Sequence, residues 1–377
     1  MAVRKRAWMT KTGRRTGWLV DYADADGKRR FESFARRRDA DAREAEIDVE
    51  LRRGVHTPAS ASPTIAEAAA NWLAAVELKG RERATLKGYR DHVELHISPA
   101  LGTMKLAALT TPRVIAFAEA LQQRKSRHLA RRVLTSLKSV LRDAQRRGNV
   151  AQNVATAISV EPDHRRRQLE VGVDIPTLDE IRKILAAASP RWRPLLVTAV
   201  FTGLRASELR GLRWEDVDLK RGELHVRQRA DRYGTIGRPK SRAGLRVIPL
   251  GPMVVNTLRE WKLTRSAGGL VFGTRNNRPT HHITLVRNAF WPAQIAAGVV
   301  TMDGKPKYTG IHALRHFYAS WCINRRADGG LELPLKVVQA RLGHASIQMT
   351  ADRYGHLFPR TDDGTELAAA ERHLLKI

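Results

Sequence analysis

The sequence predicts a multidomain α+β protein that is mostly α, with small β-sheets. Helical periodicity covers most of the chain, whereas the alternation of apolar and polar residues that marks strands is confined to short stretches. The length of 377 residues exceeds what one hydrophobic core usually serves. Polar stretches at 57–63 and 161–167 have the composition of linkers, so we expect domains at 1–57, 63–160 and 174–377.

The first segment, 1–57, is predicted to be a small β-sheet followed by a helix. Alternation over 18–22 and 29–34 predicts strands, and helical periodicity covers 39–53. Residues 1–38 contain 12 basic and 4 acidic side chains. A sheet this basic could be a DNA-binding module, and a small scaffold with a solvated surface is the alternative that the sequence leaves open.

The middle segment is predicted to be all-α. It opens with a capping box in which Thr64 and Glu67 would satisfy the first helical amides. A dense basic run at 124–132 lies at the start of its last helix. The predicted helices cover 64–78, 83–98, 112–123 and 127–147.

The third segment is predicted to be mostly helical around one small sheet. A second capping box, Thr177 with Glu180, starts its first helix. Strands at 223–229 and 246–250 flank a long basic hairpin loop. The predicted helices cover 177–188, 191–202, 205–212, 253–265, 281–297, 311–324, 334–342 and 346–352, and an apolar-patterned piece follows at 366–375.

Charge and cysteine content restrict the class of protein. Lys and Arg number 67 against 38 Asp and Glu, a net charge of +29 that is spread over all three segments. This distribution favours a nucleic-acid duplex over a membrane as the binding partner, because membrane-binding proteins usually concentrate their charge on one amphipathic helix. The most apolar stretch, Leu195–Phe201, is too short to span a bilayer, and the N-terminus lacks the apolar run of a signal peptide. Cys322 is the single cysteine, which excludes an intrachain disulfide framework and a cysteine-based zinc site.

Two clusters in the third segment have the residue types that phosphodiester chemistry requires. His312 and Arg315 are three residues apart on a predicted helix and therefore share a face. Arg205 follows a glycine turn at a helix start, where helix amides favour anions, and Glu208 could orient its guanidinium. Taken alone, an Arg–Glu pair at this spacing is usually a surface salt bridge.

A zinc site is the alternative interpretation of the histidines at 312 and 316. Their spacing matches the two ligands of HExxH, but Ala313 stands where that motif has its glutamate. We therefore expect no metal here.

The proton donor and the nucleophile are predicted from the remaining residues. Lys240 is the one lysine among several arginines of the hairpin loop, and lysine can release a proton whereas arginine in practice cannot. An ordinary solvated lysine is the alternative. Tyr354 lies at a helix end beside Gly355, where its hydroxyl can be presented to a ligand, whereas Tyr318 falls inside an apolar helix. A neutral phenol would need two arginines and a nearby histidine to activate it.

Three motifs in this order strongly resemble the tyrosine recombinases of the phage-integrase type. They are Thr-Gly-Leu-Arg-Ala-Ser-Glu-Leu at 202–209, His-Ala-Leu-Arg-His at 312–316 and Leu-Gly-His-Ala-Ser-Ile-Gln-Met-Thr-Ala-Asp-Arg-Tyr-Gly-His at 342–356. The Pro-Lys of the hairpin also matches, and the resemblance covers about 174–358. More weakly, the upstream segments resemble the arm-binding and helical core-binding domains of integrases carried by mobile elements.

The resemblance implies a mechanism through a covalent phosphotyrosine. Tyr354 would attack the scissile phosphate and leave a 3′-phosphotyrosyl link and a free 5′-hydroxyl. Arg205 and Arg315 would hold the non-bridging oxygens, and Lys240 would protonate the leaving 5′-oxygen.

The resemblance also assigns supporting roles and excludes cofactors. His312 would assist proton transfer at the tyrosine, His344 would hydrogen-bond the phosphate, and Glu208 would support the site. Because phosphotyrosine stores the energy of the broken bond, neither ATP nor a metal nor another cofactor is expected.

The expected partners follow from the same resemblance. They are double-stranded DNA attachment sites, a homo-tetramer assembled on DNA, and a DNA-bending accessory protein or excision factor, all in the nucleoid-associated cytoplasm of a prokaryotic host. The piece at 366–375 could pack on a neighbouring protomer or dock in cis. His282 and Asn288 lie on a basic helix that faces either DNA or solvent.

Three other functions remain open at this point. A chromosome-dimer resolvase of the same family would not need the basic segment at the N-terminus. A non-catalytic DNA-binding protein would not need the intact set of catalytic residue types. A type IB topoisomerase shares the chemistry but relaxes supercoils without exchanging strands. The integrase of a phage or other mobile element is the function that the sequence favours.

Overall fold

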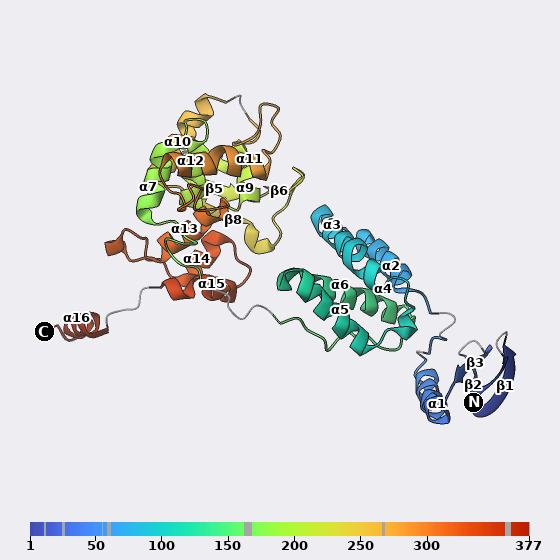
Figure 1. The fold of residues 1–377 in the computed structure, drawn as a ribbon. Helices are drawn as coiled ribbons and strands as arrows, with labels where there is room; N and C mark the ends of the chain where they lie inside the picture. Colours follow the sequence, from blue (N-terminus) through green and yellow to red (C-terminus); the bar gives the residue numbers. More distant parts are fainter. Residues whose placement is uncertain are drawn as a thin grey trace. The chain divides into compact units, whose positions relative to one another are not determined.

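The computed structural model describes residues 1–377 except 11–12, 25–26, 55, 59–61, 162–167, 266–267, 359–362 and 377. The chain divides into two compact units, Met1–Arg166 and Arg167–Ile377 (Figure 1). Of the stretches predicted as linkers, 57–63 lies outside this description at 59–61, and 161–167 lies outside it at 162–167. The predicted fold class is confirmed, since helices predominate and the sheets are small and antiparallel.

The N-terminal part of the first unit is a three-stranded antiparallel sheet with one helix. The sheet has the order β1-β2-β3, with β1 at Ala2–Thr10, β2 at Gly13–Ala23 and β3 at Arg29–Phe34, followed by α1 at Arg37–Arg52. Strand β1 was not predicted from the sequence, because its basic residues interrupt the apolar alternation and its strand form depends on pairing with β2.

The outer face of this sheet carries arginines. Val20 is fully buried and packs with residues of α1 in a small apolar core. Side chains of a strand alternate between faces, so Arg4, which pairs with Leu19, lies on the face opposite Val20. Arg4 and Arg29 both form ion pairs with Asp21 on that outer face.

The rest of the first unit is helical, as predicted. The buried residues of the longest helix, α6, recur at helical spacing from Ala130 to Ala144, so one face packs into the core and the basic face remains exposed. The predicted helix 83–98 is interrupted by a π-helical turn, η1. The elements are α2 Ile65–Leu78, α3 Arg83–His92, η1 Val93–Ile97, α4 Ser98–Leu101, η2 Leu106–Ala108, α5 Thr111–Arg124 and α6 Arg127–Arg146.

The second unit begins with three helices and a small sheet. The β4-β5-β8 sheet is antiparallel, and Leu224 of β5 pairs with Ile248 of β8, both fully buried. The predicted strand 223–229 is two strands, β5 and β6, because the chain leaves the first sheet and pairs again in the hairpin. The elements are α7 Leu178–Ala187, α8 Arg193–Thr202, α9 Ala206–Gly211, η3 Trp214–Asp216, β4 Val217–Asp218, β5 Glu223–Val226, β6 Arg229–Ala230, β7 Ile236–Gly237, η4 Arg242–Gly244 and β8 Arg246–Pro249.

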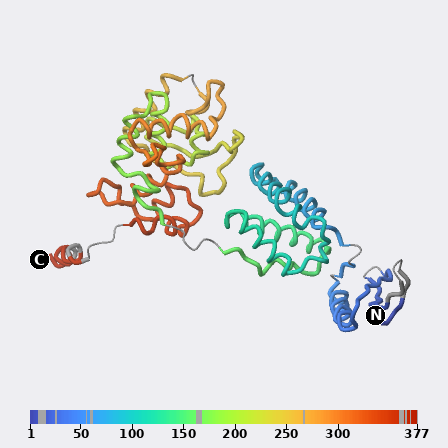
Figure 2. The backbone as a smooth tube through the Cα atoms, in the orientation of Figure 1, coloured from blue at the N-terminus to red at the C-terminus, as the bar shows by residue number. Residues whose placement is uncertain are grey.

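Further helices follow in the second unit (Figure 2), and its core takes residues from the chain up to Phe358. Nearly every residue of α8 and α13 is buried, which places both helices at the centre. The predicted helix 281–297 contains a π-helical stretch, η5. The elements are α10 Pro252–Leu263, α11 His282–Thr284, η5 Leu285–Phe290, α12 Trp291–Ala296, α13 His312–Ile323, η6 Arg326–Asp328, α14 Leu335–Leu342, α15 Ile347–Tyr354, η7 Gly355–Leu357 and α16 Asp363–Leu375.

Across the part of the chain that the structure describes, no helix is both long and apolar enough to cross a membrane.

Candidate active site

The end of α8 places Arg205 at the start of α9. Gly203 ends α8 in the left-handed conformation, with φ of 60°. A Cβ atom at Gly203 would lie 2.3 Å from the ring of Tyr318, so only glycine fits this turn. Arg205 then takes the N-cap position of α9, and its backbone N–H donates to Glu208 Oε2 at 2.9 Å.

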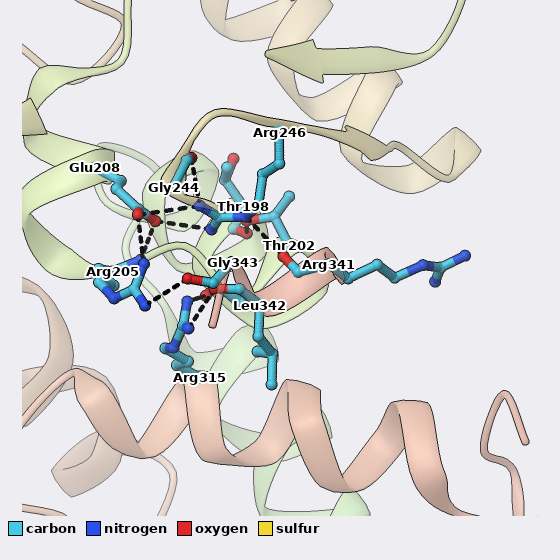
Figure 3. Close-up of polar contacts among 11 residues, drawn as sticks. Thr198, Thr202, Arg205, Glu208, Gly244, Arg246, Arg315, Arg341, Leu342 and Gly343 are labelled. Carbon is cyan, nitrogen blue, oxygen red and sulfur yellow. Dashed lines mark hydrogen bonds and ion pairs between the residues drawn. The ribbon is translucent and has the colours of Figure 1, made fainter. Parts of the chain in front are cut away.

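Glu208 is a buried carboxylate between two arginines (Figure 3). Arg205 Nη1 donates to Oε1 at 2.8 Å. Arg246 donates to both oxygens, from Nη1 to Oε1 at 3.1 Å and from Nη2 to Oε2 at 2.8 Å. Burial alone would raise the pKa of Glu208, but the arginines, Arg246 foremost, lower that pKa to about 2. Glu208 is therefore ionised at neutral pH and holds both guanidinium groups in place.

Arg315 and Arg205 both donate hydrogen bonds to the turn at 342–343. Arg315 is only 2% exposed, and it donates from Nη1 to the Gly203 carbonyl at 2.7 Å and from Nη2 to the Leu342 carbonyl. Arg205 Nη2 donates to the next carbonyl, that of Gly343, at 3.1 Å. Burial and the nearby charge of Arg205 lower the pKa of Arg315 to about 9. The guanidinium remains charged at neutral pH, so the turn lies in a strongly positive environment suited to an anion.

The hairpin that carries Lys240 packs against this turn at its base. Gly343 has φ of 64°, and a Cβ atom there would lie 2.9 Å from the Ala243 carbonyl oxygen and 2.8 Å from Arg246 Nη1. Arg246 also donates from Nε to the Arg341 carbonyl at 2.7 Å. Lys240 itself lies exposed on the loop before η4, outside the buried cluster.

Two of the predicted histidines lie beside these arginines. His344 is buried, its Nδ1 is 2.9 Å from the hydroxyl of Thr350, and its ring stacks parallel to that of Tyr354 with 6.2 Å between centroids. Burial, followed by the charges of Arg315 and Arg205, lowers the pKa of His344 to about 4. His312 is the first residue of α13 and is partly open to solvent, and the same effects lower its pKa to about 4. Both imidazoles are therefore neutral at neutral pH.

Tyr354 is buried rather than presented at the surface. The helix expected at 346–352 continues to Tyr354 as α15, and this side chain is 1% exposed. Its hydroxyl lies 2.7 Å from Nδ1 of His316. Burial raises the pKa of Tyr354, against the opposing effect of Arg315, so the phenol is neutral. The predicted helix end at Tyr354 is confirmed, but the hydroxyl lies in the core instead of at the surface, because the end of α15 turns the ring inward.

The structure brings most of the predicted site residues together and adds others. The residues that cluster are Arg205, Glu208, His312, Arg315, His344 and Tyr354. Sequence reasoning missed Arg246 and His316. Arg246 was grouped with the other arginines of the loop, and nothing in its local sequence connects it to Glu208. His316 was considered only as a zinc ligand, although its position one helical turn after His312 places both on one face of α13.

Other candidates remain predictions. Asn288 is exposed on η5, and His282 is exposed on α11. Among the described residues, no three His, Cys, Asp or Glu side chains are grouped so that they could hold a metal ion. The leucines of α16, including Leu367 and Leu374, are exposed.

Two family models match the chain. Residues 176–360 match the phage integrase family and residues 65–160 match the phage integrase central domain. The first match contains every residue of the cluster described above.

Curated relatives and solved structures agree with these matches. The tyrosine recombinase XerC-like protein of Caldanaerobacter subterraneus is 27% identical over 86% of this chain and 87% of its own. An integrase of Streptomyces ambofaciens is 28% identical over 77% of this chain and 76% of its own. Among solved structures, the Tn1549 transposon integrase in complex with a circular intermediate DNA covers 82% of this chain and 100% of its own, with a TM-score of 0.66 and 19% identity. The lambda integrase dimer bound to a COC′ core site covers 94% of this chain and 97% of its own, with a TM-score of 0.60 and 22% identity.

Proposed function

Because this chain belongs to the phage integrase family of tyrosine recombinases, we propose that it is the site-specific DNA recombinase of a phage or other mobile element. It cleaves and rejoins DNA strands. The observation that carries the proposal is a buried tyrosine hydroxyl in a cluster that also contains Arg205, Arg315 and neutral histidines. Such a cluster provides a nucleophile, donors for phosphate oxygens and groups that can accept a proton.

In the proposed reaction Tyr354 attacks the scissile phosphate. A bond forms between its oxygen and phosphorus, and the bond to the 5′-oxygen breaks, which leaves a 3′-phosphotyrosyl link. Arg205 and Arg315 hold the non-bridging oxygens. The guanidinium of Arg246 donates to both oxygens of Glu208 and to two backbone carbonyls. That of Arg205 donates to one oxygen of Glu208 and one carbonyl, and that of Arg315 donates to carbonyls alone. We therefore assign phosphate contact to Arg205 and support of the site to Arg246.

The remaining residues transfer protons, bind the phosphate or hold the arginines in place. Lys240 protonates the leaving 5′-oxygen, for which its exposed loop would fold over the bound DNA. His312 assists proton transfer at the tyrosine. His344 hydrogen-bonds the phosphate through Nε2, since its Nδ1 already pairs with Thr350. Glu208 holds Arg205 and Arg246.

The upstream segments are proposed to bind DNA. In this proposal segment 1–57 is an arm-type DNA-binding domain, and the arginines on the outer face of its sheet contact the phosphate backbone. Segment 63–160 is the core-binding domain, whose basic face on α6 would lie against the duplex. Segment 174–377 is the catalytic domain. The protein would act in the cytoplasm as a homo-tetramer on two attachment sites, with a DNA-bending or excision factor as accessory protein.

A chromosome-dimer resolvase is the second candidate within the family. The tyrosine recombinase XerC of Xylella fastidiosa, 29% identical over 74% of this chain, favours it. The sheet of β1–β3 with α1 favours the mobile-element integrase, because an arm-type module serves the extra sites of such elements.

A covalent trap tests the proposed function. Wild-type protein and Tyr354→Phe are expressed in a host that carries the element, the cells are denatured rapidly in chelator, and the ends of protein-linked DNA are sequenced. We expect adducts at one short locus with wild type and at least about a 10³-fold loss in the variant. Tyr318→Phe is the matched control, since Tyr318 is also buried in the second unit and its ring packing on Gly203 would be retained.

Each outcome separates the alternatives. Adducts scattered over the genome would identify a topoisomerase. A wild-type protein that occupies one locus without forming adducts would overturn the catalytic function and leave a DNA-binding role. Adducts confined to the junction of replicated chromosomes, in hosts without any mobile element, would favour the resolvase.

A further inference from the structure

His316 is the one described side chain with an atom at hydrogen-bond distance from the Tyr354 hydroxyl. Its Nδ1 lies 2.7 Å from that oxygen, and both side chains are buried. The roles derived above leave His316 without a function. We propose that His316 is a positioning residue that holds the nucleophilic hydroxyl of Tyr354 by accepting its hydrogen bond at Nδ1, an inference that rests on the proposed function.

The ring of His316 is fixed by its surroundings. It follows His312 by one turn of α13, and the two rings meet edge to face with 4.6 Å between centroids. Tyr354 is fixed on its other side by the parallel ring of His344. With both rings fixed, only the hydroxyl hydrogen of Tyr354 can still rotate about the C–O bond. The hydrogen bond to Nδ1 fixes the direction of that hydrogen and leaves the oxygen lone pairs unoccupied.

The direction of this hydrogen bond follows from the protonation states. Burial, together with the charges of His312, Arg353 and Arg315, lowers the pKa of His316 to about 3, so its ring is neutral. Burial also keeps the phenol of Tyr354 neutral. Between a neutral phenol and a neutral imidazole, the phenol is the stronger acid and the unprotonated ring nitrogen the stronger base. The hydroxyl therefore donates and Nδ1 accepts.

This bond has a consequence for the nucleophile. A tyrosine oxygen attacks through a lone pair, which must point at phosphorus while the proton points elsewhere. Arg315 donates to the carbonyls of Gly203 and Leu342 and so does not orient the hydroxyl. His316 provides that orientation and, as the acceptor of the hydroxyl hydrogen bond, is also the first group that can receive the proton. His312, whose ring meets that of His316 edge to face, can then assist the transfer only through His316.

Two substitutions separate the hydrogen bond from the bulk of the ring. His316→Phe keeps a planar ring and removes Nδ1, whereas His316→Asn places an amide atom where Nδ1 stood. The readout is the rate of covalent adduct formation by the full chain on the locus recovered by the trap, at saturating DNA, alongside the affinity for that DNA. We expect the phenylalanine variant to form adducts about 10- to 100-fold more slowly and the asparagine variant to recover most of the rate, with affinity unchanged in both.

A buried histidine elsewhere in the chain is the matched control. His92 is buried in the first unit and its Nδ1 lies 2.8 Å from the hydroxyl of Ser136. His92→Phe therefore removes the same kind of contact far from Tyr354 in sequence and should leave the adduct rate of saturated DNA unchanged.

The outcomes distinguish this inference from the proposed function. If wild type forms no adduct, the proposed function fails. If wild type is active and His316→Phe equals it, or if the phenylalanine and asparagine variants are equally slow, the positioning role of His316 is overturned and the recombinase function stands.

A second measurement covers the case in which His316→Phe does not fold. In protein labelled with ¹⁵N at histidine, Tyr354→Phe removes only the hydroxyl, and we expect the Nδ1 resonance of His316 to move toward that of a free acceptor. An unchanged Nδ1 resonance for His316 would overturn the inference without any substitution of the histidine.

Discussion

Two regions of the site differ in how they are held. The arginines and the carboxylate at 205, 208, 246 and 315 form a buried network with hydrogen bonds to three backbone carbonyls of the 341–343 segment. The loop that carries Lys240 is exposed, and its base at 242–244 packs against this network. The residues proposed to bind phosphate are therefore assembled by folding, while the proposed proton donor lies on a surface loop.

The reason for this division lies in the chemistry of each group. Guanidinium groups must be held in a fixed geometry to match phosphate oxygens, and burial between a carboxylate and carbonyls fixes them. A lysine that gives up a proton needs access to the leaving oxygen, which arrives only with the DNA. The network should therefore control both stability and activity, whereas the loop should control activity alone.

The largest expected effect is on the network. Glu208→Gln removes the negative charge that Arg205 and Arg246 share and leaves two closely spaced positive charges without compensation. We expect a loss of about 3–5 kcal/mol in the free energy of unfolding of the full chain, measured by urea titration. Glu215→Gln is the control, because the Glu215 side chain is 62% exposed in its pair with Arg213 and should cost at most about 0.5 kcal/mol. Equal costs for the two variants would contradict the claim that the network is a structural unit.

The next effect concerns the loop. Lys240→Ala should slow adduct formation by about 10²-fold, the contribution of a general acid, and change the free energy of unfolding by less than about 0.5 kcal/mol. Arg238→Ala, which removes a charge from the same exposed loop outside its base, should change the rate much less.

The role of Lys240 as an acid has its own test. A substrate with sulfur in place of the leaving 5′-oxygen departs without protonation, since a thiolate is far less basic than an alkoxide. On this substrate Lys240→Ala should cleave at the wild-type rate. A defect that persists there would assign Lys240 to DNA binding instead.

Much of the candidate site could be predicted from the sequence, because residue type and local spacing indicate the chemistry. Arg205 with Glu208, and His312 with Arg315, each lie within one helical turn, and the family resemblance orders the remaining residues. Local patterns also predicted most helices, since apolar residues recur at helical spacing. The mostly α fold class followed from those patterns and is confirmed.

The parts that were missed depend on contacts between distant residues. Arg246 meets Glu208 across 38 positions, and no local pattern in the hairpin indicates that pairing. His316 gains its partner only when α15 packs against α13 across 38 positions. Strand β1 forms because β2 is beside it, and the burial of Tyr354 follows from the direction in which α15 ends. Tertiary packing decides each of these features.

The smallest expected effect, per unit of pH, is on the pH dependence of the free energy of unfolding, which tests whether the buried network differs from the Lys240 loop. The buried His316 and His344 have their pKa values lowered to about 3 and about 4, whereas an unfolded histidine titrates near its model value of 6.5. Between these limits the unfolded chain binds more protons, so stability is present above pH of about 6.5 and falls as the pH drops toward 4. Each histidine contributes a slope of at most about 1.4 kcal/mol per pH unit.

Glu208 contributes to stability over a lower pH range, and its contribution is likewise lost as the pH falls. Its pKa is about 2 in the fold against 4.5 in the unfolded chain, so its contribution is present above pH of about 4.5 and is lost as the pH falls toward 2. Urea unfolding at a series of pH values should show both windows. His344→Asn should reduce the slope in the upper window, where His316 still contributes, Glu208→Gln should flatten the lower one, and Lys240→Ala should change neither. A wild-type slope retained in all three variants would place the titrating groups outside the network and remove the physical distinction between the two regions.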